Sequence, residues 1–598
     1  MTFAPPITDQ RFALETVADI AGLAALPAFA AATPEVVDAV LGEAGRLAAE
    51  VFAPLNTVGD REGAHLAEGR VRLPPGFSEA HRTFAEGGWV GLAAQPEWGG
   101  QGLPFALAAM VQESLTAANM AWSLCPMLTL GAIEALQVHG DAWQKETFLR
   151  PLVAGRWTGT MCLTEPQAGS DVGALRTEAV PAGDGSWRLR GTKIYITWGE
   201  HDLAENIIHL VLARTPGAPP GTRGISLFLC PKYLPAPDGR PGARNDITCL
   251  SLEHKLGIRA SPTCTMSFGD QGACVGWMVG EAHAGMRAMF TMMNHARISV
   301  GLQGIAIAER AFQAALAHAR ARVQSARFGD PSRAPARIIA HADVRRMLMT
   351  IKAHVEACRA IAALNAAAVD RAHAEPDPEA RADAKGLADL LTPVTKAFAT
   401  DMGVEMTSLA LQVFGGMGYV EETGAAQHYR DARIAPIYEG TNGIQALDLV
   451  GRKLAIDGGR HWRALIARER AQLRALPAAG DLGAIRPYAE DALEALQTAS
   501  VWMAGNAGRS PDDMAAGAGP YLRLFGLALG GALLARQAAE AARRLAEGRG
   551  DPAFLRAKIA TARFYAEQIL PQAPALLGPA TRGAAALYAI PEEALLAA

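Results

Sequence analysis

One carboxylate, Glu439, stands in a run of residues that suits acid–base chemistry. It follows Tyr438 among apolar neighbours beyond a proline, and Thr441 or Asn442 would cap a helix that begins near Ile444. Burial at such a helix entrance tunes the proton affinity of a carboxylate, as a general base requires. A glutamate before a helix cap is also common in ordinary structure, so this pattern alone leaves both interpretations open.

Two further segments combine small residues in a way that suits an anionic ligand. Met161–Gly173 (MCLTEPQAGSDVG) begins like a strand, breaks at Glu165, and lets backbone N–H groups and the Ser170 hydroxyl approach an anion. Gln412–Gly424 (QVFGGMGYVEETG) carries three glycines in four positions after a helical run. An ordinary turn also explains the first segment, and helix termination explains part of the second.

Signatures of several other chemistries are missing from the sequence. There is no GxxxxGK[ST], and no GxGxxG between a strand and a helix, which disfavours P-loop and Rossmann nucleotide sites. There is no HExxH, no clustered Cys/His spacing and no GxSxG, so we predict neither a metal site nor a hydrolase elbow. The seven cysteines form no CxxC, which predicts small buried side chains rather than a disulfide framework.

The composition describes a folded chain with a large interior. Of its 598 residues 50% are hydrophobic and 19% charged, which excludes disorder as the dominant state. Because single cores stop growing near about 250–300 residues, we expect several domains. The net charge of −4 gives no basic field for nucleic acid or anionic lipid. No secretory signal is visible, and the run Phe525–Ala535 is too short to span a bilayer, so we predict a soluble cytoplasmic protein.

The hydrophobic period divides the chain into segments that must position these residues. Thr33, Pro34 and Glu35 predict a helix start in a mainly helical segment 1–160, of which residues 1–34 are an extension. Alternating β-branched runs predict a β domain over 161–282. Helical runs at 286–324, 336–374 and 385–415 then predict a bundle over 283–455. Further helices are predicted over 456–598, at 461–476, 485–505, 520–547 and 552–571. The predicted fold class is α+β, mainly α.

In this order and spacing the segments resemble the acyl-CoA dehydrogenase flavoprotein family from about residue 35 to 455. Gly155–Gly173 (GRWTGTMCLTEPQAGSDVG) is similar to that family's β-domain entry, and Lys193–Gly199 (KIYITWG) to the strand against the isoalloxazine ring. Glu253–Ser261 (EHKLGIRAS) matches another shared run. The chain's continuation to residue 598 and its run Tyr438–Leu454 resemble the long branch that includes 3-methylmercaptopropionyl-CoA dehydrogenases.

The resemblance implies a fold and a reaction. The expected fold has an N-terminal helical domain, a central β-barrel-like domain, a C-terminal four-helix bundle and an additional C-terminal helical domain. The expected reaction is FAD-dependent α,β-dehydrogenation of an acyl-CoA thioester, with Glu439 removing the α-proton. The expected partners are an electron-transfer flavoprotein and a second copy of the chain, as a homodimer or a dimer of dimers, without nucleic acid or membrane.

Residue roles carry over from the family position by position. Ser170 would reach both flavin and substrate, and Asn294 and Arg297 would face the acyl-CoA. The other expected FAD contacts are Met161, Leu163, Thr164, Gly169, Tyr195, Ile196, Thr197, Arg322, Gln324, Gln412, Val413, Phe414, Gly415, Gly416, Gly440, Thr441, Asn442 and Gly443. Gln412–Gly416 would meet the FAD adenylate across a subunit interface. The family run R-x-T-F-G departs here to Arg322–Ala326 (RVQSA), which changes the contacts after the arginine.

Several alternatives stay open on the sequence alone. The acyl group favoured by the resemblance is 3-(methylthio)propanoyl, and short- or medium-chain fatty acyl and aryl-propionyl groups are alternatives. An acyl-CoA oxidase shares the expected fold. A flavin-containing, DNA-associated stress protein belongs to another class, for which the C-terminal arginines are the feature of interest; interleaved acids indicate that these arginines solvate outer helix faces.

Overall fold

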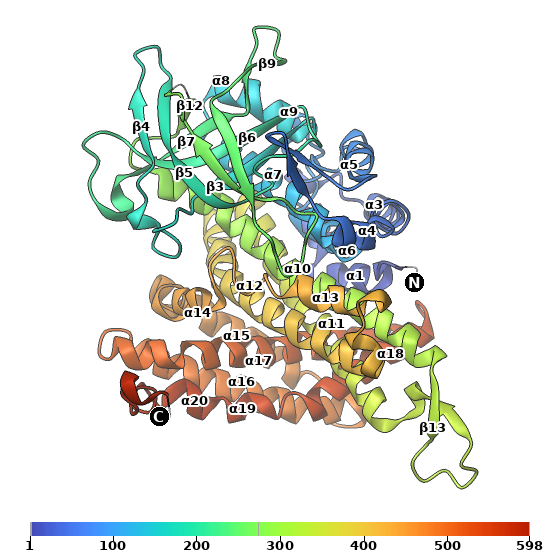
Figure 1. Ribbon diagram of the computed structural model, residues 1–598. Coiled ribbons are helices and arrows are strands. Elements are labelled where there is room, and N and C mark those ends of the chain that lie inside the picture. Colours follow the sequence, from blue (N-terminus) through green and yellow to red (C-terminus); the bar gives the residue numbers. More distant parts are fainter. Residues whose placement is uncertain (1–2, 273, 597–598) are drawn as a thin grey trace.

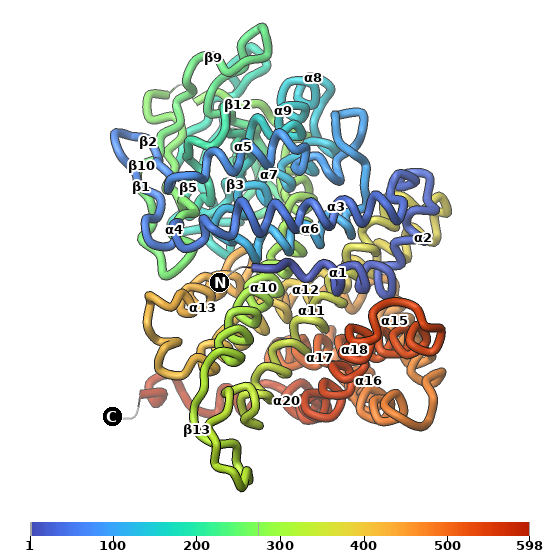
Figure 2. The backbone as a smooth tube through the Cα atoms, turned by 90° about the vertical axis from the view of Figure 1, so that its right-hand side faces the viewer, coloured from blue at the N-terminus to red at the C-terminus, as the bar shows by residue number. Residues whose placement is uncertain are grey.

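Three layers build the molecule. The computed structural model describes residues 3–272 and 274–596. A β sheet and the N-terminal helices lie at one end, the C-terminal helices lie at the other, and three long helices run between them (Figure 1). Figure 2 shows the same order from the side, with the first helix passing between the N-terminal helices and the bundle.

The N-terminal part of the chain is helical, as the period predicts. Thr33 accepts a hydrogen bond from the Val36 N–H at 3.4 Å and caps a helix with Pro34 in its first turn, which confirms that predicted start. The helices are α1 (Ile7–Ala13), α2 (Ile20–Ala24), α3 (Pro34–Leu47), α4 (Leu55–Glu62), α5 (Phe77–Glu86), α6 (Phe105–Ala118), α7 (Met120–His139), α8 (Ala142–Gln144) and α9 (Arg150–Val153), with a small hairpin of β1 (His65–Ala67) and β2 (Arg70–Arg72).

The central sheet has eight strands, and β4 joins it beside the path β10-β11-β5-β12-β7-β6-β3. Strand β5 is long enough to pair with β11 along its second half and with β12 and β4 along its first half. The strands are β3 (Trp157–Cys162), β4 (Glu178–Pro181), β5 (Trp187–Thr197), β6 (Asn206–Arg214), β7 (Ile225–Pro231), β10 (Ile247–Leu252), β11 (Thr263–Phe268) and β12 (Cys274–Val279), beside a separate hairpin of β8 (Tyr233–Pro235) and β9 (Pro241–Arg244).

Long helices form the bundle. They are α10 (Gly285–Ala321), α11 (Ala342–Ala374) and α12 (Pro378–Phe414), completed by the shorter α13 (Ala425–Ala432) and α14 (Asn442–Gly451). Helices α10 and α12 run in the same direction and approach closely, because a Cβ added at Gly304 would lie 2.2 Å from the Ala399 carbonyl oxygen. This close approach sets residues of α12 beside the middle turns of α10.

Several predicted helix ends are wrong, by three to nine residues. Helix α11 begins at Ala342 rather than at 336, because residues 335–340 form a short strand and a 3-10 turn. Helix α10 ends at Ala321 rather than at 324, because a protruding hairpin of β13 (Val323–Ala326) and β14 (Pro335–Arg337) follows it. Helix α12 begins at Pro378 rather than at 385, since Asp377 caps it and its polar residues occupy exposed first turns. In the C-terminal part, helix α17 (Pro511–Ala546) begins nine residues before the predicted start at 520, because Pro520 lies inside the helix.

The C-terminal helices pack against the face of the bundle that is remote from the sheet (Figure 1). They are α15 (Arg460–Arg474), α16 (Gly480–Asn506), α17 (Pro511–Ala546), α18 (Pro552–Gln568), α19 (Gln572–Ala575) and α20 (Leu577–Thr581). Helix α17 contacts α11, α12 and α14, and its buried Phe525 belongs to the same apolar core as Phe398 of α12. By length and composition α7 and α17 could cross a membrane, but 78% and 83% of their apolar windows are buried in the fold.

The seven cysteines are free and buried, as predicted.

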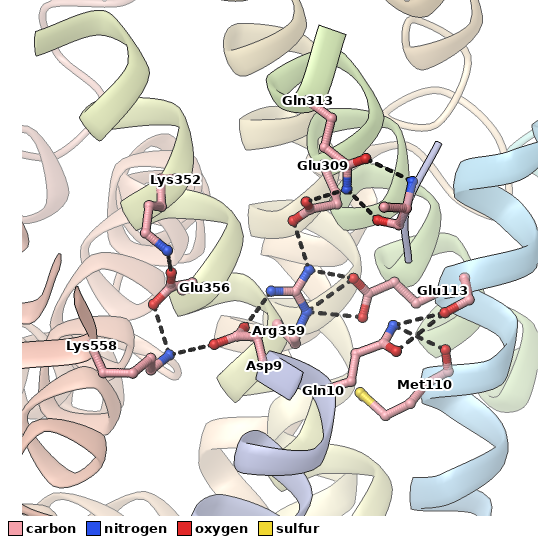
Figure 3. Close-up of polar contacts among 12 residues, drawn as sticks. Asp9, Gln10, Met110, Glu113, Glu309, Gln313, Lys352, Glu356, Arg359 and Lys558 are labelled. Atoms are coloured by element: carbon pink, nitrogen blue, oxygen red, sulfur yellow. Dashed lines mark hydrogen bonds and ion pairs between the residues drawn. The ribbon is translucent and has the colours of Figure 1, made fainter. Parts of the chain in front are cut away.

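A buried ionic cluster joins the layers (Figure 3). Arg359 of α11 pairs with Asp9 of α1, Glu113 of α6 and Glu309 of α10. Lys558 of α18 pairs with Asp9 and with Glu356 of α11, both at 2.7 Å. One network of charges therefore holds the first helix, the N-terminal helices, the bundle and the C-terminal helices together.

Candidate active site

The candidate base lies on a strained loop directly before α14. Glu439 has φ +56° and Gly440 has φ +83°, and a non-glycine residue persists in this region only where its surroundings hold it there. The Thr441 hydroxyl accepts a hydrogen bond from the Ile444 N–H at 3.3 Å and caps α14. Of the two predicted caps, Thr441 is the correct one, and the helix begins two residues earlier than expected, at Asn442.

The surroundings of Glu439 raise its proton affinity. Burial raises the pKa of the Glu439 carboxyl, and the positive charges of Arg297 and Lys396 oppose that shift. The neighbouring Tyr438 hydroxyl donates a hydrogen bond to the side-chain oxygen of Gln303 on α10. A carboxylate with a raised pKa beside two cations suits a general base that must be ionised before it takes a proton.

Lys396 of α12 is part of this site, and sequence reasoning missed it. Its side chain is fully buried, and Nζ donates to the Gly440 carbonyl oxygen at 2.9 Å and to Asn442 Oδ1 at 2.8 Å. The Asn442 amide also donates to Asp401 Oδ1 at 2.6 Å. The available signal was a lone lysine inside an otherwise apolar helical stretch, which sequence alone does not connect to a loop more than 40 residues away.

Gln445 is a second residue that sequence reasoning missed. Its side-chain amide lies 3.3 Å from the carbonyl oxygens of Glu439 and Gly440. A Cβ at Gly440 would lie 2.7 Å from that amide nitrogen, so this position requires glycine both for its φ and for space. The Gly440 carbonyl oxygen therefore accepts hydrogen bonds from both Lys396 and Gln445.

Arg297, an expected substrate residue, lies on α10 near the base. It is 5% exposed, and its Nη1 lies 3.5 Å from Asp448 Oδ2 of α14. Among the described residues its Nε has no hydrogen-bond partner, so the guanidinium retains a donor for a ligand. Asn294 is half-buried one turn earlier on the same helix, and its spacing from Arg297 puts both residues on one face.

An apolar cavity of about 570 Å³ opens beside this group between α6, α7 and α10. Its walls include Phe105, Trp122 and Met127, and a Ser299–Gln112 hydrogen bond of 2.9 Å lies along it. Glu439 and Arg297 are not among the described residues that line it. Gln303 lines the cavity and accepts a hydrogen bond from the Tyr438 hydroxyl, so it connects the cavity to the loop that carries Glu439. The cavity suits an apolar chain whose polar end reaches the base.

The first group of expected flavin residues lies at one edge of the sheet. Met161 is buried, Leu163 and Thr164 are half-buried, and Gly169 and Ser170 are exposed. The loop that carries them is fixed by Glu165, which pairs with Lys193 at 2.8 Å and accepts the Thr177 hydroxyl at 2.6 Å. Burial opposes ionisation of Glu165, but the Lys193 charge and these hydrogen bonds lower its pKa to about 2. The sequence pattern did not reveal this buried ion pair.

Strand β5 brings the next group to the same edge. The Ile194 N–H donates to the Thr164 carbonyl oxygen at 2.9 Å, so the end of β5 lies against the Met161–Ser170 loop. Tyr195 is 59% exposed with φ +59°, Ile196 is buried and Thr197 is half-buried. The structure therefore brings the end of β5 and the Met161–Ser170 loop next to each other.

Gly440, Thr441, Asn442 and Gly443, also expected to contact the flavin, lie directly after Glu439 on the base loop and in the first turn of α14. The other expected flavin residues lie at the other end of the bundle. Arg322 follows the last turn of α10 and bonds Gln324 at 3.2 Å, and both are exposed. Gln412, Gly415 and Gly416 are exposed at the end of α12, where Val413 and Phe414 are buried. Arg322 follows Arg297 by 25 residues along the chain, which is about 37 Å at the rise of an α-helix. Within one chain the structure does not bring these residues to Glu439.

Four family models match the chain in order. They describe the N-terminal domain (39–156), the middle domain (160–271) and the C-terminal domain (283–454) of acyl-CoA dehydrogenases, followed by an "Acetyl-CoA dehydrogenase C-terminal like" region (463–591). The chain is 47% identical to the 3-methylmercaptopropionyl-CoA dehydrogenase of Ruegeria pomeroyi, over 95% of this chain and 96% of that protein.

Two further relatives agree with this match. A butyryl-CoA dehydrogenase of Syntrophomonas wolfei is 37% identical over 90% of this chain and 89% of its own length. The crystal structure of Caenorhabditis elegans ACDH-11 in complex with C11-CoA shares the fold, with a TM-score of 0.76 at 20% identity over 95% of this chain and 92% of that one. The extent and identity of the first two matches show that the chain belongs to the acyl-CoA dehydrogenase family, whose members are FAD-dependent oxidoreductases.

Proposed function

We propose that this enzyme dehydrogenates 3-(methylthio)propanoyl-CoA between Cα and Cβ to give 3-(methylthio)acryloyl-CoA. The substrate is inferred from the relative in Ruegeria pomeroyi, which matches nearly the whole chain. The observation that carries the chemistry is Glu439, a partly buried carboxylate on a strained loop that Gln303 links to an apolar cavity. We further propose the cytoplasm as its compartment and an electron-transfer flavoprotein as its electron acceptor.

Glu439 is the proposed base. Its carboxylate removes the α-proton of the thioester, and burial supplies a basicity above that of a surface carboxylate. The Glu439 backbone N–H donates no hydrogen bond to any described residue, so it is available to the thioester carbonyl as negative charge develops there. Arg297 and Asn294 lie on the α10 face near the base and are proposed to orient the thioester.

The chain's residues fit a flavin at the sheet edge. A Cβ added at Gly169 would meet nothing within 4 Å, and the Ser170 and Tyr195 side chains are exposed. We propose that these residues, with Thr197, hold FAD together with the buried Met161 region. When bound, FAD supplies the acceptor for the β-hydrogen, which leaves as hydride.

A second copy of the chain is part of this proposal. Arg322 and Gln412–Gly416 present exposed polar and glycine positions that also fit a dinucleotide, but they lie at the end of the bundle remote from Glu439. A homodimer, or a dimer of dimers, would bring this group of one protomer to the flavin of its partner.

A short- or medium-chain fatty acyl-CoA is the second candidate substrate. The cavity of about 570 Å³ is lined mainly by apolar and aromatic side chains and is larger than a methylthiopropanoyl group needs. The butyryl-CoA dehydrogenase of Syntrophomonas wolfei is also similar over most of the chain. Assays across a panel of acyl-CoA thioesters with an artificial electron acceptor would separate the two candidates.

The Glu439→Gln variant tests the proposed chemistry. We expect it to keep its bound FAD, because the amide preserves the shape of the side chain, and to lose flavin reduction by substrate by about 10²–10⁴-fold, the usual contribution of a general base. The measurement is stopped-flow bleaching of the flavin absorbance after mixing with acyl-CoA. Glu422→Gln, at an exposed residue of the loop between α12 and α13, is the matched control and should bleach at the wild-type rate. Undiminished bleaching by the Glu439 variant would overturn the assignment.

A further inference from the structure

Lys396 is a buried cation whose hydrogen bonds all serve the loop of the proposed base. It is fully buried in α12, and its Nζ donates to the Gly440 carbonyl oxygen at 2.9 Å and to Asn442 Oδ1 at 2.8 Å. A buried ammonium is costly unless it is paired and hydrogen-bonded. Among the described residues no carboxylate lies within ion-pairing distance of this nitrogen.

Three charged groups act electrostatically on Lys396. Glu439 lies on the loop before α14, Asp401 lies one turn along α12 itself, and Arg297 lies on α10 with Asp448 of α14 as its counter-ion. The Asp401 carboxylate already accepts a hydrogen bond from the Asn442 amide at 2.6 Å. Glu439 is therefore the carboxylate whose charge Lys396 is placed to balance.

We propose that Lys396 is the positioning residue of the base: it fixes the strained Glu439–Asn442 loop through two hydrogen bonds, and its ammonium keeps Glu439 ionised. This inference rests on the proposed function, because it assigns a role toward the base of that reaction. Lys396 acts through Glu439 and through the backbone of Gly440.

The strain of the loop explains why an anchor is required. Glu439 has positive φ, a strained conformation for a non-glycine residue, so without an anchor the loop would relax and move the carboxylate out of position. Gln445 donates to the Gly440 carbonyl oxygen at 3.3 Å, whereas Lys396 makes the shorter, charge-assisted hydrogen bond to it at 2.9 Å. Burial lowers the pKa of Lys396 to about 7, while the charges of Glu439 and Asp401 act in the opposite direction.

The sign of the electrostatic effect follows from these contacts. The Lys396 charge lowers the pKa of Glu439 against the raising effect of burial. Removing that charge therefore raises the pKa of Glu439, and the carboxylate form needed for catalysis is lost at a higher pH. The acid limb of the kcat/KM profile should move to higher pH, and a limb that moves by about one pH unit lowers the rate about tenfold at any pH below it.

The test is the pH profile of Lys396→Met, measured with the holoenzyme. We expect the acid limb of kcat/KM to rise by about one pH unit and kcat at the optimum to fall about 10–100-fold, with FAD content unchanged. Lys558→Met is the matched control, because Lys558 is 2% exposed and also hydrogen-bonded to buried partners, but lies in α18 away from the loop. It should lower thermal stability without moving the limb.

A second variant separates charge from contact and covers the case in which Lys396→Met does not fold. Lys396→Gln keeps a hydrogen-bond donor without the charge. It should therefore shift the acid limb of kcat/KM as far as Lys396→Met does, but lower kcat less. A limb that stays at the wild-type pH in folded, FAD-loaded Lys396 variants would overturn the inference. A wild-type enzyme that oxidises no acyl-CoA would instead overturn the proposed function, so the two failures are distinguishable.

Discussion

Arg359→Met is the perturbation that the buried ionic cluster makes most informative. The guanidinium is 1% exposed and lies 2.6 Å from Glu113 and 3.0 Å from Glu309, and it also bonds Asp9 (Figure 3). Methionine fills similar volume without charge. After the change Asp9 keeps Lys558 as its partner, but Glu113 and Glu309 lose theirs.

The expected cost comes from the two carboxylates left without a cation. Removing one partner of a buried ion pair costs about 3–5 kcal/mol, because the remaining charge stays desolvated. Burial already raises the pKa of Glu113 despite the Arg359 charge, so in the variant Glu113 takes up a proton more readily still. A carboxyl whose folded pKa lies above its unfolded value destabilises the fold as pH rises. The loss of stability of Arg359→Met relative to the wild type should therefore be largest near pH 7.5 and become smaller toward pH 5.

Thermal unfolding at pH 7.5 and pH 5.5 measures this effect, read as the midpoint of the first transition because so large a chain does not unfold in two states. The combined variant Arg359→Met, Glu113→Leu, Glu309→Met removes the stranded charges and should recover most of the lost stability. Arg346→Met, at an exposed pair with Asp343 on the same helix, is the control and should change little. If the combined variant unfolds at no higher temperature than Arg359→Met alone, the reasoning is refuted. The lost stability would then come from the lost attraction of the ion pairs and not from the desolvation of the unpaired carboxylates.

Two other predictions concern the flavin loop and the C-terminal helices. The pKa of Glu165 is lowered to about 2, so its carboxylate stabilises the fold above its unfolded pKa of about 4.3, and that stabilisation disappears as the pH falls from about 4.3 toward 2. The variant Glu165→Gln should lose this pH dependence of stability and bind less FAD at pH 7. An unchanged flavin absorbance per protein would contradict this prediction. Deleting residues 456–598 uncovers the faces of α11, α12 and α14 that α17 buries and should give insoluble or FAD-poor protein, whereas a soluble, fully active truncation would contradict the shared core.

The parts of the fold that the sequence predicts are those encoded by local patterns. The hydroxyl and proline at Thr33 and Pro34 place a helix start, and the helical period places α10, α11 and α12 to within a few residues at most ends. The helix cap at Thr441 and the apolar neighbours of Glu439 locate the base loop. Each of these signals depends on residues a few positions apart.

The parts that could not be predicted depend on contacts between distant residues. Lys396 and Gly440 are 44 positions apart, Lys193 and Glu165 are 28 apart, and Arg359 and Asp9 are 350 apart. A charged residue in a helical pattern looks like a solvated one until the fold shows what packs over it. The predicted start of α17 at residue 520 is also wrong, because the helix continues through Pro520 from Pro511.

The cluster around Arg359 also bears on the shape of the proposed substrate cavity. Glu113 follows Gln112 on α6, and Gln112 lines the cavity beside Ser299 of α10, to which it is hydrogen-bonded. Glu309 lies further along α10, so one guanidinium holds α6 and α10 at a fixed separation. Closely packed helices transmit a displacement at one point along their length. Arg359 therefore connects two helices that flank the cavity, although it does not line the cavity itself, and we expect Arg359→Met to change acyl-chain preference as well as stability.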